Sequence, residues 1–182
     1  MNTDGLKKEE IYELLKRIGE NLGYSAQREV NTGVSKVDLV WFDRKIAVDL
    51  YRKPESKELA IEGTMLIPIV GFEVEEKTAV RKILRGDIDS LNSLYPSLGV
   101  LVLSSIMKQA HFKRQLKVTN SKEKATKRSE KWFDTDIRFA RKVASMNPFR
   151  RIIVLTDLDV VRLDERISAM KKREHKLRHS TA

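Results

Sequence analysis

The sequence predicts an α/β fold, a three-layer domain in which helices cover both faces of a mixed central sheet. Segments with helical spacing of apolar residues alternate with short strand-like segments along the chain. Two strand-like segments, residues 100–103 and 152–155, are entirely apolar, as in strands that are covered on both faces. The chain has 182 residues, about the size of one domain, with no internal repeat and no break in composition.

The first half of the chain predicts one helix followed by strands. Apolar residues recur at helical spacing through residues 5–22, and Gly23 is a good helix end. β-forming residues and turn signals follow, and a later apolar segment passes Pro68 and ends in acidic residues. We expect strands at 25–30, 36–42, 46–51 and 66–75, a tight turn at 43–45 that makes a hairpin, and a loop or short helix at 52–65.

The second half predicts helices that alternate with single strands. An amphipathic helix is expected over residues 78–94, because apolar residues recur there at helical spacing before Pro96. After the strand at 100–103, we expect basic helices at 105–118 and 128–146 around a polar break at 119–122, a strand at 152–155 and a helix at 161–178. The whole forms one domain, 1–182, with a core at about 5–104, a basic helical segment at about 105–150 and a C-terminal strand and helix at about 151–178.

The composition narrows the classes of function. The chain has no cysteine, which excludes a disulfide scaffold, a cysteine-ligated metal centre and a cysteine nucleophile. No apolar run reaches the roughly 18 residues of a membrane span, and the N-terminus lacks an apolar signal core. We therefore expect no membrane contact and a cytoplasmic or nucleoid-associated protein. The eight glycines form no phosphate-binding loop, which argues against a nucleotide hydrolase or a dinucleotide enzyme.

Positive charge is concentrated in one segment. The net charge is +10, and residues 106–151 carry 14 Lys and Arg against 4 Asp and Glu. Such a segment favours a polyanion such as DNA as the partner, because Lys and Arg release counterions from phosphates. The expected contact residues are Lys113, Arg114, Lys117, Lys124, Lys127, Arg128 and Lys131. Trp132, Phe133 and Phe139 are aromatic residues in a further basic stretch, but helical spacing favours a place in the core for Phe133 and Phe139 over base stacking. The cations among them are Lys131, Arg138, Arg141 and Lys142.

Two predicted strands carry acidic residues in apolar surroundings. Glu73 and Glu75 alternate along the strand at 66–75 and therefore face the same side of the sheet, with Lys77 also on that side if the strand continues. Asp38 lies in the apolar strand at 36–42. Neighbouring carboxylates raise each other's pKa unless a cation lies between them, and oxygen-rich sites suit Mg²⁺ or Mn²⁺. The pattern therefore predicts a divalent-metal site.

At these residues the chain resembles the PD-(D/E)XK nuclease superfamily, which has the restriction-endonuclease-like fold. Asp38 in the segment KVDLVWF resembles the first metal-binding acid of that family. Glu73 in GFEVEEK resembles the second acid, in a Phe-Glu-Val-Glu variant of the motif. The predicted element order over about residues 5–104 is similar to the family's αβββαβ core, to which the basic helices would be additions.

The resemblance implies metal-dependent hydrolysis of DNA phosphodiester bonds. Asp38 and Glu73 would bind Mg²⁺ or Mn²⁺, and Glu75 or Lys77 would orient the attacking water. In several branches of the family, a glutamate of the first helix joins the metal site. The candidates for that role here are Glu9, Glu10 and Glu13, of which Glu13 is preferred.

Two features depart from the family pattern. Glu75 stands at the position of the motif lysine. The 34 residues between Asp38 and Glu73 imply an insertion, and Asp49 in a second apolar strand is an alternative first acid that we rank below Asp38.

We expect a metal-dependent DNA endonuclease, for which a homodimer is plausible because one active site cuts one strand. The alternatives are a catalytically inactive nucleic-acid-binding protein on the same fold and an assembly subunit whose basic helices dock an acidic protein.

Other titratable residues show weaker patterns. His175 and His179 have a spacing that can bind zinc on a helix, but no third ligand accompanies them. The segment TDLD, with acids at 157 and 159, is expected to cap the last helix. Asp87 and Asp89 lie about 200° apart on their helix and therefore do not converge.

Overall fold

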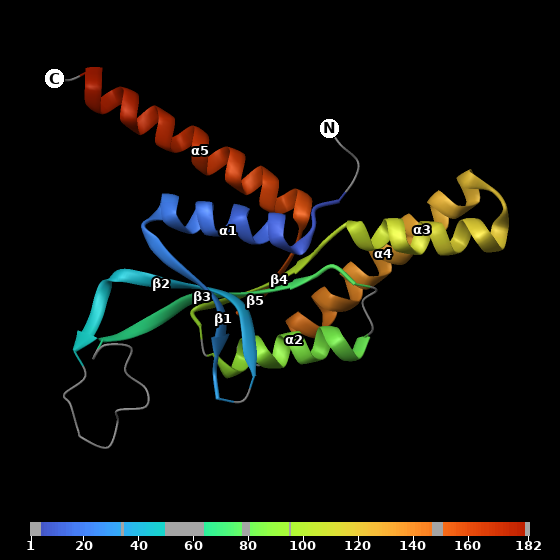
Figure 1. Cartoon of the computed structure of the whole chain (residues 1–182), viewed down its shortest axis with the longest axis horizontal. Helices are drawn as coiled ribbons and strands as arrows, with labels where there is room; N and C mark the ends of the chain where they lie inside the picture. The colour runs from blue at the N-terminus through green and yellow to red at the C-terminus, as the bar shows by residue number, and fades with distance from the viewer. Residues whose placement is uncertain are drawn as a thin grey trace.

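The computed structural model describes residues 5–33, 35–49, 64–77, 81–94, 96–146 and 151–180. Its helices are α1 (Lys8–Leu22), α2 (Arg81–Ser93), α3 (Ile106–Thr119), α4 (Lys122–Ser145) and α5 (Asp157–Ser180). Its strands are β1 (Tyr24–Asn31), β2 (Lys36–Asp49), β3 (Thr64–Glu75), β4 (Leu98–Leu103) and β5 (Ile152–Thr156). Figure 1 shows how these helices surround the central strands.

Within the part of the chain that the structure describes, the strands form one open, mixed sheet in the order β1-β2-β3-β4-β5. β1, β2 and β3 are antiparallel neighbours, whereas β3, β4 and β5 run parallel. Parallel neighbours need a crossover connection, which α2 provides between β3 and β4, and α3 with α4 between β4 and β5. The prediction of an α/β fold with a mixed sheet is confirmed.

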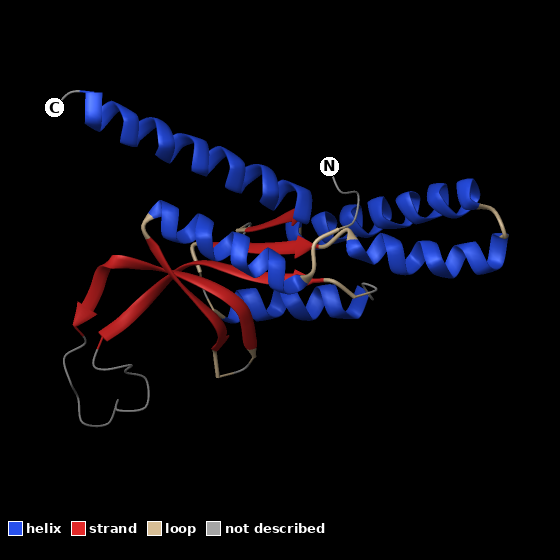
Figure 2. Cartoon of the chain, turned by 45° about the horizontal axis from the view of Figure 1, so that its top comes forward, coloured by secondary structure: helices blue, strands red, loops and turns tan. Residues whose placement is uncertain are grey.

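Two apolar clusters cover opposite faces of this sheet. One cluster joins α1 and α5 to strand residues that include Leu39, Phe72 and Val100. The other joins α2, α3 and α4 to Leu101 and Leu103 of β4. Because successive residues of a strand point to opposite faces, these clusters make α1 with α5 one layer and α2 with α4 another. The arrangement can be followed in Figure 2.

α1 lies close to the sheet at Gly19. A Cβ atom at this position would lie 2.7 Å from Trp41 Nε1. The Trp41 ring is buried, stacks on Tyr24 with 5.8 Å between centroids and contacts the ring of Phe72 at 4.6 Å. Glycine therefore allows the helix backbone to rest on the indole, which fixes α1 over β1, β2 and β3.

The tight turn expected at residues 43–45 is wrong. β2 runs from Lys36 to Asp49, and the strand expected at 46–51 is its second half. Its pairing with β3 shifts register between Phe42 and Ala47, so the polar triplet is an irregularity within a long strand. The hairpin is instead formed by β2 and β3, and most of the loop expected at 52–65 lies outside the described residues.

Two helices begin earlier than the sequence predicts. α4 begins at Lys122, because the Ser121 hydroxyl accepts a hydrogen bond from the N–H of Lys124 and caps the helix. α5 begins directly after Thr156, whose N–H and hydroxyl donate to the Asp159 carboxylate at 2.9 and 2.8 Å. The capping role expected of the TDLD segment is confirmed, and the cap moves the start of α5 forward from residue 161.

α3 and α4 form a helical hairpin, here called the basic arm (residues 106–145). The arm projects from one end of the sheet, and α1 begins at the same end (Figure 1). α3 follows β4 almost directly, and the N–H of Ser104 donates to the carbonyl of Glu75 at 2.9 Å. The basic arm therefore begins beside the acidic end of β3.

Candidate functional site

Asp38 and Glu73 lie side by side on the neighbouring strands β2 and β3. The register pairs Leu39 with Phe72, and Asp38 and Glu73 each lie one residue beyond this pair on their own strands. Asp38 Oδ2 accepts a hydrogen bond from the N–H of Val74 at 2.8 Å, which fixes this carboxylate against β3. The structure therefore brings together the two acids that stood out in separate strands of the sequence.

Glu73 is a buried acid with an unsatisfied oxygen. The residue is only 6% exposed, and its Oε1 atom has no hydrogen-bond partner among the described residues. Burial, the charge of Asp38 and a side-chain hydrogen bond with Asp38 raise the pKa of Glu73 well above its usual range. A raised pKa favours the protonated form of Glu73 in the metal-free protein, in which the proton offsets charge that a cation could offset instead. A divalent cation that replaced it would satisfy both groups.

Asp87 of α2 belongs to the same group of acids, so setting it aside was wrong. Its Oδ2 atom is buried and has no partner in the described part of the chain. Burial and then the charges of Glu75 and Asp38 raise the pKa of Asp87 to about 7. Asp89, two residues along the same helix, is exposed. Asp87 and Asp89 do not converge with each other, as expected, but Asp87 converges with acids of two strands.

A lysine that the sequence did not single out neutralises part of this charge. Lys8 begins α1, and its N–H donates to Glu76 Oε2 at 2.8 Å, just past the end of β3. Its Nζ atom lies 2.8 Å from Asp38 Oδ2 and 2.9 Å from Asp38 Oδ1. The Lys8 charge lowers the pKa of Glu73 and Asp87, an effect that is smaller than the upward effect of burial. α1 therefore brings an ammonium group into the site.

Tyr12, one turn further along α1, lies against Asp38. Burial, the charge of Asp38 and a side-chain hydrogen bond with Asp38 raise the pKa of Tyr12. The Tyr12 ring lies 5.6 Å from Lys8 Nζ and 4.4 Å from the guanidinium carbon of Arg28. Arg28 in turn forms hydrogen bonds of 2.7 and 2.9 Å with Glu9. Glu9 is thus engaged with Arg28 in an exposed ion pair.

Glu75 faces the same layer as Glu73 and occupies the position of the motif lysine. Both residues alternate on β3 opposite Leu101 and Leu103 of β4, which belong to the α2 side of the sheet. The N–H of Lys77 donates to Glu75 Oε1 at 2.7 Å, and Lys77 is exposed. This contact comes from the Lys77 backbone, and the described residues show no contact between its ammonium and the acids of the site.

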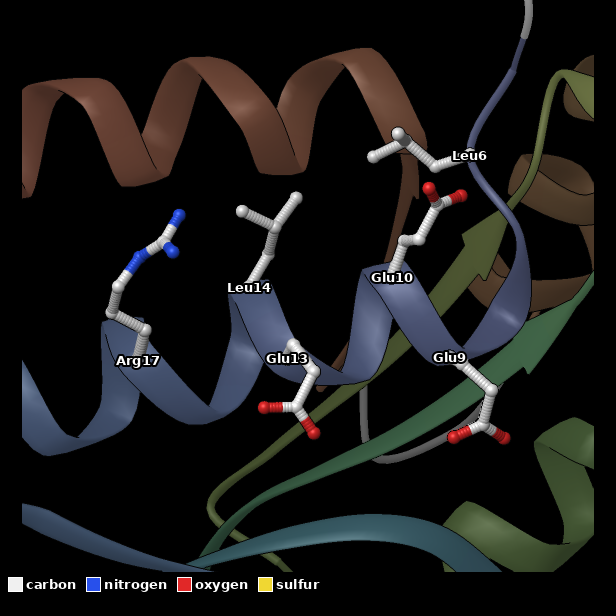
Figure 3. A pocket seen from close by; sticks show the side chains of 6 residues that line it. All are labelled: Leu6, Glu9, Glu10, Glu13, Leu14 and Arg17. Carbon is white, nitrogen blue, oxygen red and sulfur yellow. The ribbon is translucent and has the colours of Figure 1, made fainter.

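Glu13, the preferred metal ligand of the first helix, lies elsewhere. It is exposed and about 100° around α1 from Tyr12, the residue that faces Asp38. It lines an open pocket with Leu6, Glu9, Glu10, Leu14 and Arg17. Figure 3 shows Leu14 and Arg17 on the side of α1 toward α5, and Glu13 on the other side. Arg17 binds Asp164 of α5 at 2.6 and 2.9 Å, so the pocket borders the α1–α5 contact rather than the Asp38–Glu73 pair.

Asp49, the alternative first acid, lies at the far end of β2. Its backbone pairs with Thr64 at the start of β3. Thr64 precedes Glu73 by nine residues, a separation of about 30 Å at the rise of a strand. The side chain of Asp49 is outside the described residues. This distance favours Asp38 as the acid that works with Glu73.

The expected DNA-contacting residues all lie exposed on the basic arm. Those of α3 are Lys113, Arg114 and Lys117, and those of α4 are Lys124, Lys127, Arg128 and Lys131. The set on α4 recurs at spacings of three and four residues and therefore forms one stripe. Arg128 donates to Gln115 of α3 at 3.3 Å, so the stripe lies beside α3. His111 and Trp132 stack at 4.6 Å, and Phe133 is buried in the core as its spacing indicated.

The acidic site fits a hard divalent cation in its donor type. Asp38, Glu73 and Asp87 offer carboxylate oxygens, the ligands that Mg²⁺ and Mn²⁺ prefer, and two of these oxygens are buried without a partner among the described residues. No three such side chains in the described part of the chain form a ready metal cage. Mg²⁺ commonly uses one or two carboxylates and keeps several waters, which is what the Asp38–Glu73 pair can provide.

In the described ranges, no helix has the length and apolar character needed to cross a bilayer. The side chains of His175 and His179 on α5 lie outside the described residues, so the structure does not bear on a zinc site there. Comparisons of the chain with protein-family models, with curated proteins and with solved structures gave no match.

Proposed function

We propose that this protein is a metal-dependent DNA endonuclease of the PD-(D/E)XK type, which hydrolyses phosphodiester bonds with Mg²⁺ or Mn²⁺. The order α1-β1-β2-β3-α2-β4 supports the proposal, because it is the αβββαβ order of the restriction-endonuclease-like core. The acids that resemble the family motif lie on the neighbouring strands β2 and β3. Since one active site cuts one strand, cleavage of both strands of a duplex would use a homodimer.

The observation that carries the proposal is the Asp38–Glu73 pair. Two acidic side chains from separate strands lie together, and Glu73 is 6% exposed with an oxygen that lacks a partner in the described structure. Burial of an acid in this way lowers the stability of the folded protein unless a bound ligand compensates for it. Strongly perturbed acids of this kind cluster at functional sites.

Each residue of the site has a role that follows from its position. Asp38 and Glu73 would hold the ion, which when bound supplies an activated water and offsets charge on the phosphate. The N–H of Val74 keeps Asp38 in one orientation, and Glu73 would release its proton when it binds the ion. Asp87 adds negative charge from α2. Glu75, on the same face as Glu73, is the group suited to orient the attacking water.

The basic arm would hold the DNA backbone. It starts beside Glu75, and Lys113 and Lys117 lie about 10 and 17 Å along α3 from its first residue. At about 3.4 Å per base pair, these lysines would meet phosphates roughly three to five base pairs from the cut. Contacts of this kind fix position without reading sequence.

A cleavage assay tests the proposal. Supercoiled, linear, single-stranded and four-way-junction DNA would be incubated with Mg²⁺, Mn²⁺ or EDTA and resolved on gels. We expect metal-dependent cutting by the wild type, no cutting by the Asp38→Asn/Glu73→Gln variant and normal cutting by Asp89→Asn, which removes an exposed acid from α2. Cutting that persists in EDTA or in the double variant would refute the assignment.

A specific observation favours one alternative, a catalytically inactive nucleic-acid-binding protein on the same fold. Glu75 stands at the lysine position, and the Lys77 ammonium makes no contact with the acids within the described residues. Under this alternative, the wild type would bind DNA with a steep salt dependence but would cut no substrate with either metal. The same gels, read with a filter-binding assay, separate the two functions.

A further inference from the structure

The ion pair between Lys8 and Asp38 ties the first residue of α1 to the acidic site. Lys8 Nζ lies 2.8 and 2.9 Å from the two oxygens of Asp38. The backbone of Lys8 is held separately by Glu76, whose carboxylate accepts its N–H at 2.8 Å. The position of the residue is therefore fixed by its main chain, while its ammonium is held by Asp38.

The Lys8 ammonium occupies a place that a metal ion would also seek. Asp38 Oδ2 already accepts a hydrogen bond from the N–H of Val74, and Glu73 and Tyr12 also lie against this carboxylate, so Lys8 takes up part of a limited acceptor capacity. A divalent cation bound to Asp38 would therefore have to displace the ammonium or stand close beside it. Two cations this close repel each other strongly in a partly buried site.

Lys8 is also able to leave Asp38. Its side chain is 33% exposed and that of Asp38 is 21% exposed, so the pair lies at the surface of the site. A lysine carries its charge on a flexible four-carbon stem that can turn while the backbone stays in place. The anionic group that a substrate would bring to this position is a DNA phosphate, to which an ammonium binds as a point charge.

We propose that Lys8 is a resident cation of the site, which holds Asp38 in the metal-free protein and turns to the substrate phosphate when a divalent ion binds. This inference rests on the proposed function. Lys8 then supplies the positive charge that Glu75, at the motif-lysine position, does not. It is better placed for this role than Lys77, which is exposed and reaches Glu75 through its backbone N–H.

This role predicts two effects of opposite sign for the same substitution. Lys8→Met keeps much of the apolar stem and removes the charge. We expect Mn²⁺ to bind about three- to tenfold more tightly, because the competing ammonium is gone. We also expect single-turnover cleavage at saturating Mn²⁺ to fall by about tenfold or more, because the phosphate loses its cation. A lysine that merely pinned α1 to β2 would weaken both properties.

The experiment is a calorimetric Mn²⁺ titration without DNA, followed by single-turnover cleavage with saturating Mn²⁺. Lys16→Met, which removes an exposed charge from the same helix, controls for net charge and should match the wild type. Lys8→Arg keeps the charge and should bind Mn²⁺ with near wild-type affinity. Thermal unfolding of each variant verifies folding, and Lys8→Gln replaces Lys8→Met if the latter does not fold.

Each outcome decides the inference. Unchanged or weaker Mn²⁺ binding by Lys8→Met would overturn the competition between Lys8 and the ion. Tighter binding with unchanged cleavage would overturn the phosphate contact. If the wild type binds Mn²⁺ but cuts no DNA, the proposed nuclease activity is wrong. The Mn²⁺ affinity of Lys8→Met and its DNA affinity in Mn²⁺ then still test the proposed role of Lys8. If the wild type binds no Mn²⁺, the metal site and this inference both fail.

Discussion

The acidic site and the basic arm are two charged regions of the described structure, and they are built in opposite ways. In the site, Asp38, Glu73 and Asp87 come from three different elements and lie partly or fully out of water. In the arm, the cations follow two consecutive helices and are exposed. One region therefore depends on tertiary packing, and the other depends on local sequence.

This difference determines how each region should respond to substitution. Charges in a medium of low dielectric constant interact strongly, and neighbouring acids accordingly raise the pKa of Glu73 and of Asp87. Charges on an exposed helix are screened by salt and act almost independently. We therefore expect large, non-additive effects in the site and smaller, roughly additive effects in the arm.

The largest effect should come from Glu73→Gln or Asp38→Asn. Each variant keeps the shape of the side chain and removes one of the proposed metal ligands, so we expect single-turnover cleavage to fall by about a thousandfold or more. The double variant should be little worse than either single variant, because the two acids act as one unit. DNA affinity measured in EDTA should be unchanged, since that binding belongs to the arm. An affinity that fell with cleavage would show that the two regions are not separate.

The basic arm should show the next largest effect, on binding rather than on chemistry. In the variant Lys124→Ala/Lys127→Ala/Arg128→Ala, we expect DNA affinity to fall by about ten- to a hundredfold for every sequence. The slope of log affinity against log salt should decrease by about 2 to 3. Filter binding at several salt concentrations measures both quantities.

A matched control removes the same number of charges from α5, in the variant Lys171→Ala/Lys172→Ala/Lys176→Ala. These residues are exposed and lie outside the arm. If this control lowers the salt slope as much as the arm variant does, net charge rather than the arm carries the binding. A loss confined to one DNA sequence would also contradict phosphate contact.

The sequence predicts those features of the site that depend on the pattern of a single strand. Alternation predicts that Glu73 and Glu75 share a face, and the register of β3 with β4 agrees. The apolar residues around Asp38 also mark this acid as unusual, because an acidic side chain is unfavourable in an apolar strand unless it has a partner or a function. The turn expected at residues 43–45 failed because a polar triplet can also be absorbed in a long, irregular strand.

Asp87 and Lys8 show what a one-dimensional pattern misses. The helical pattern relates Asp87 to Asp89 on its own helix, whereas its neighbours in space are on β2 and β3. A signal was present, because Asp87 lies three residues after Leu84 and four before Leu91, both fully buried, so it shares their face. Lys8 gave no such signal. Its role depends on where α1 begins relative to β2, which only the packed structure defines.

A smaller effect, on the free energy of unfolding, is expected when the packing of α1, the helix that carries Lys8, is weakened. Gly19→Ala would put a Cβ atom 2.7 Å from Trp41 Nε1, and we expect it to cost about 1 to 3 kcal/mol of unfolding free energy. Gly86→Ala is the matched control, because its Cβ meets nothing within 4 Å in the described structure. That variant should gain about 0.5 to 1 kcal/mol from helix propensity. Urea unfolding measures both, and equal signs for the two variants would rule out the close approach of α1.

The smallest expected effect is on the pH dependence of stability. The pKa of Asp87 is raised from 3.8 to about 7, and that of Glu73 is raised from 4.5. Above about pH 5 the unfolded chain has released these protons, whereas the metal-free folded protein retains them. The folded state then binds more protons, so its stability is greatest below about pH 4 for these groups and falls as pH rises. For Asp87, the loss is complete once pH passes about 7.

Asp87→Asn removes one of these titrations and keeps the shape of the side chain. In EDTA, its melting temperature should therefore fall less between about pH 5 and pH 8 than that of the wild type, by a few degrees at most. Asp89→Asn alters an exposed acid of the same helix and should follow the wild type. Mn²⁺ should raise the melting temperature of the wild type more at pH 8 than at pH 5, because the ion binds the deprotonated acids. The contrary result is a wild-type melting temperature that falls no more steeply with pH than that of Asp87→Asn. That result would mean that Asp87 is already ionised in the folded protein, and that burial and the charges of Glu75 and Asp38 do not raise its pKa.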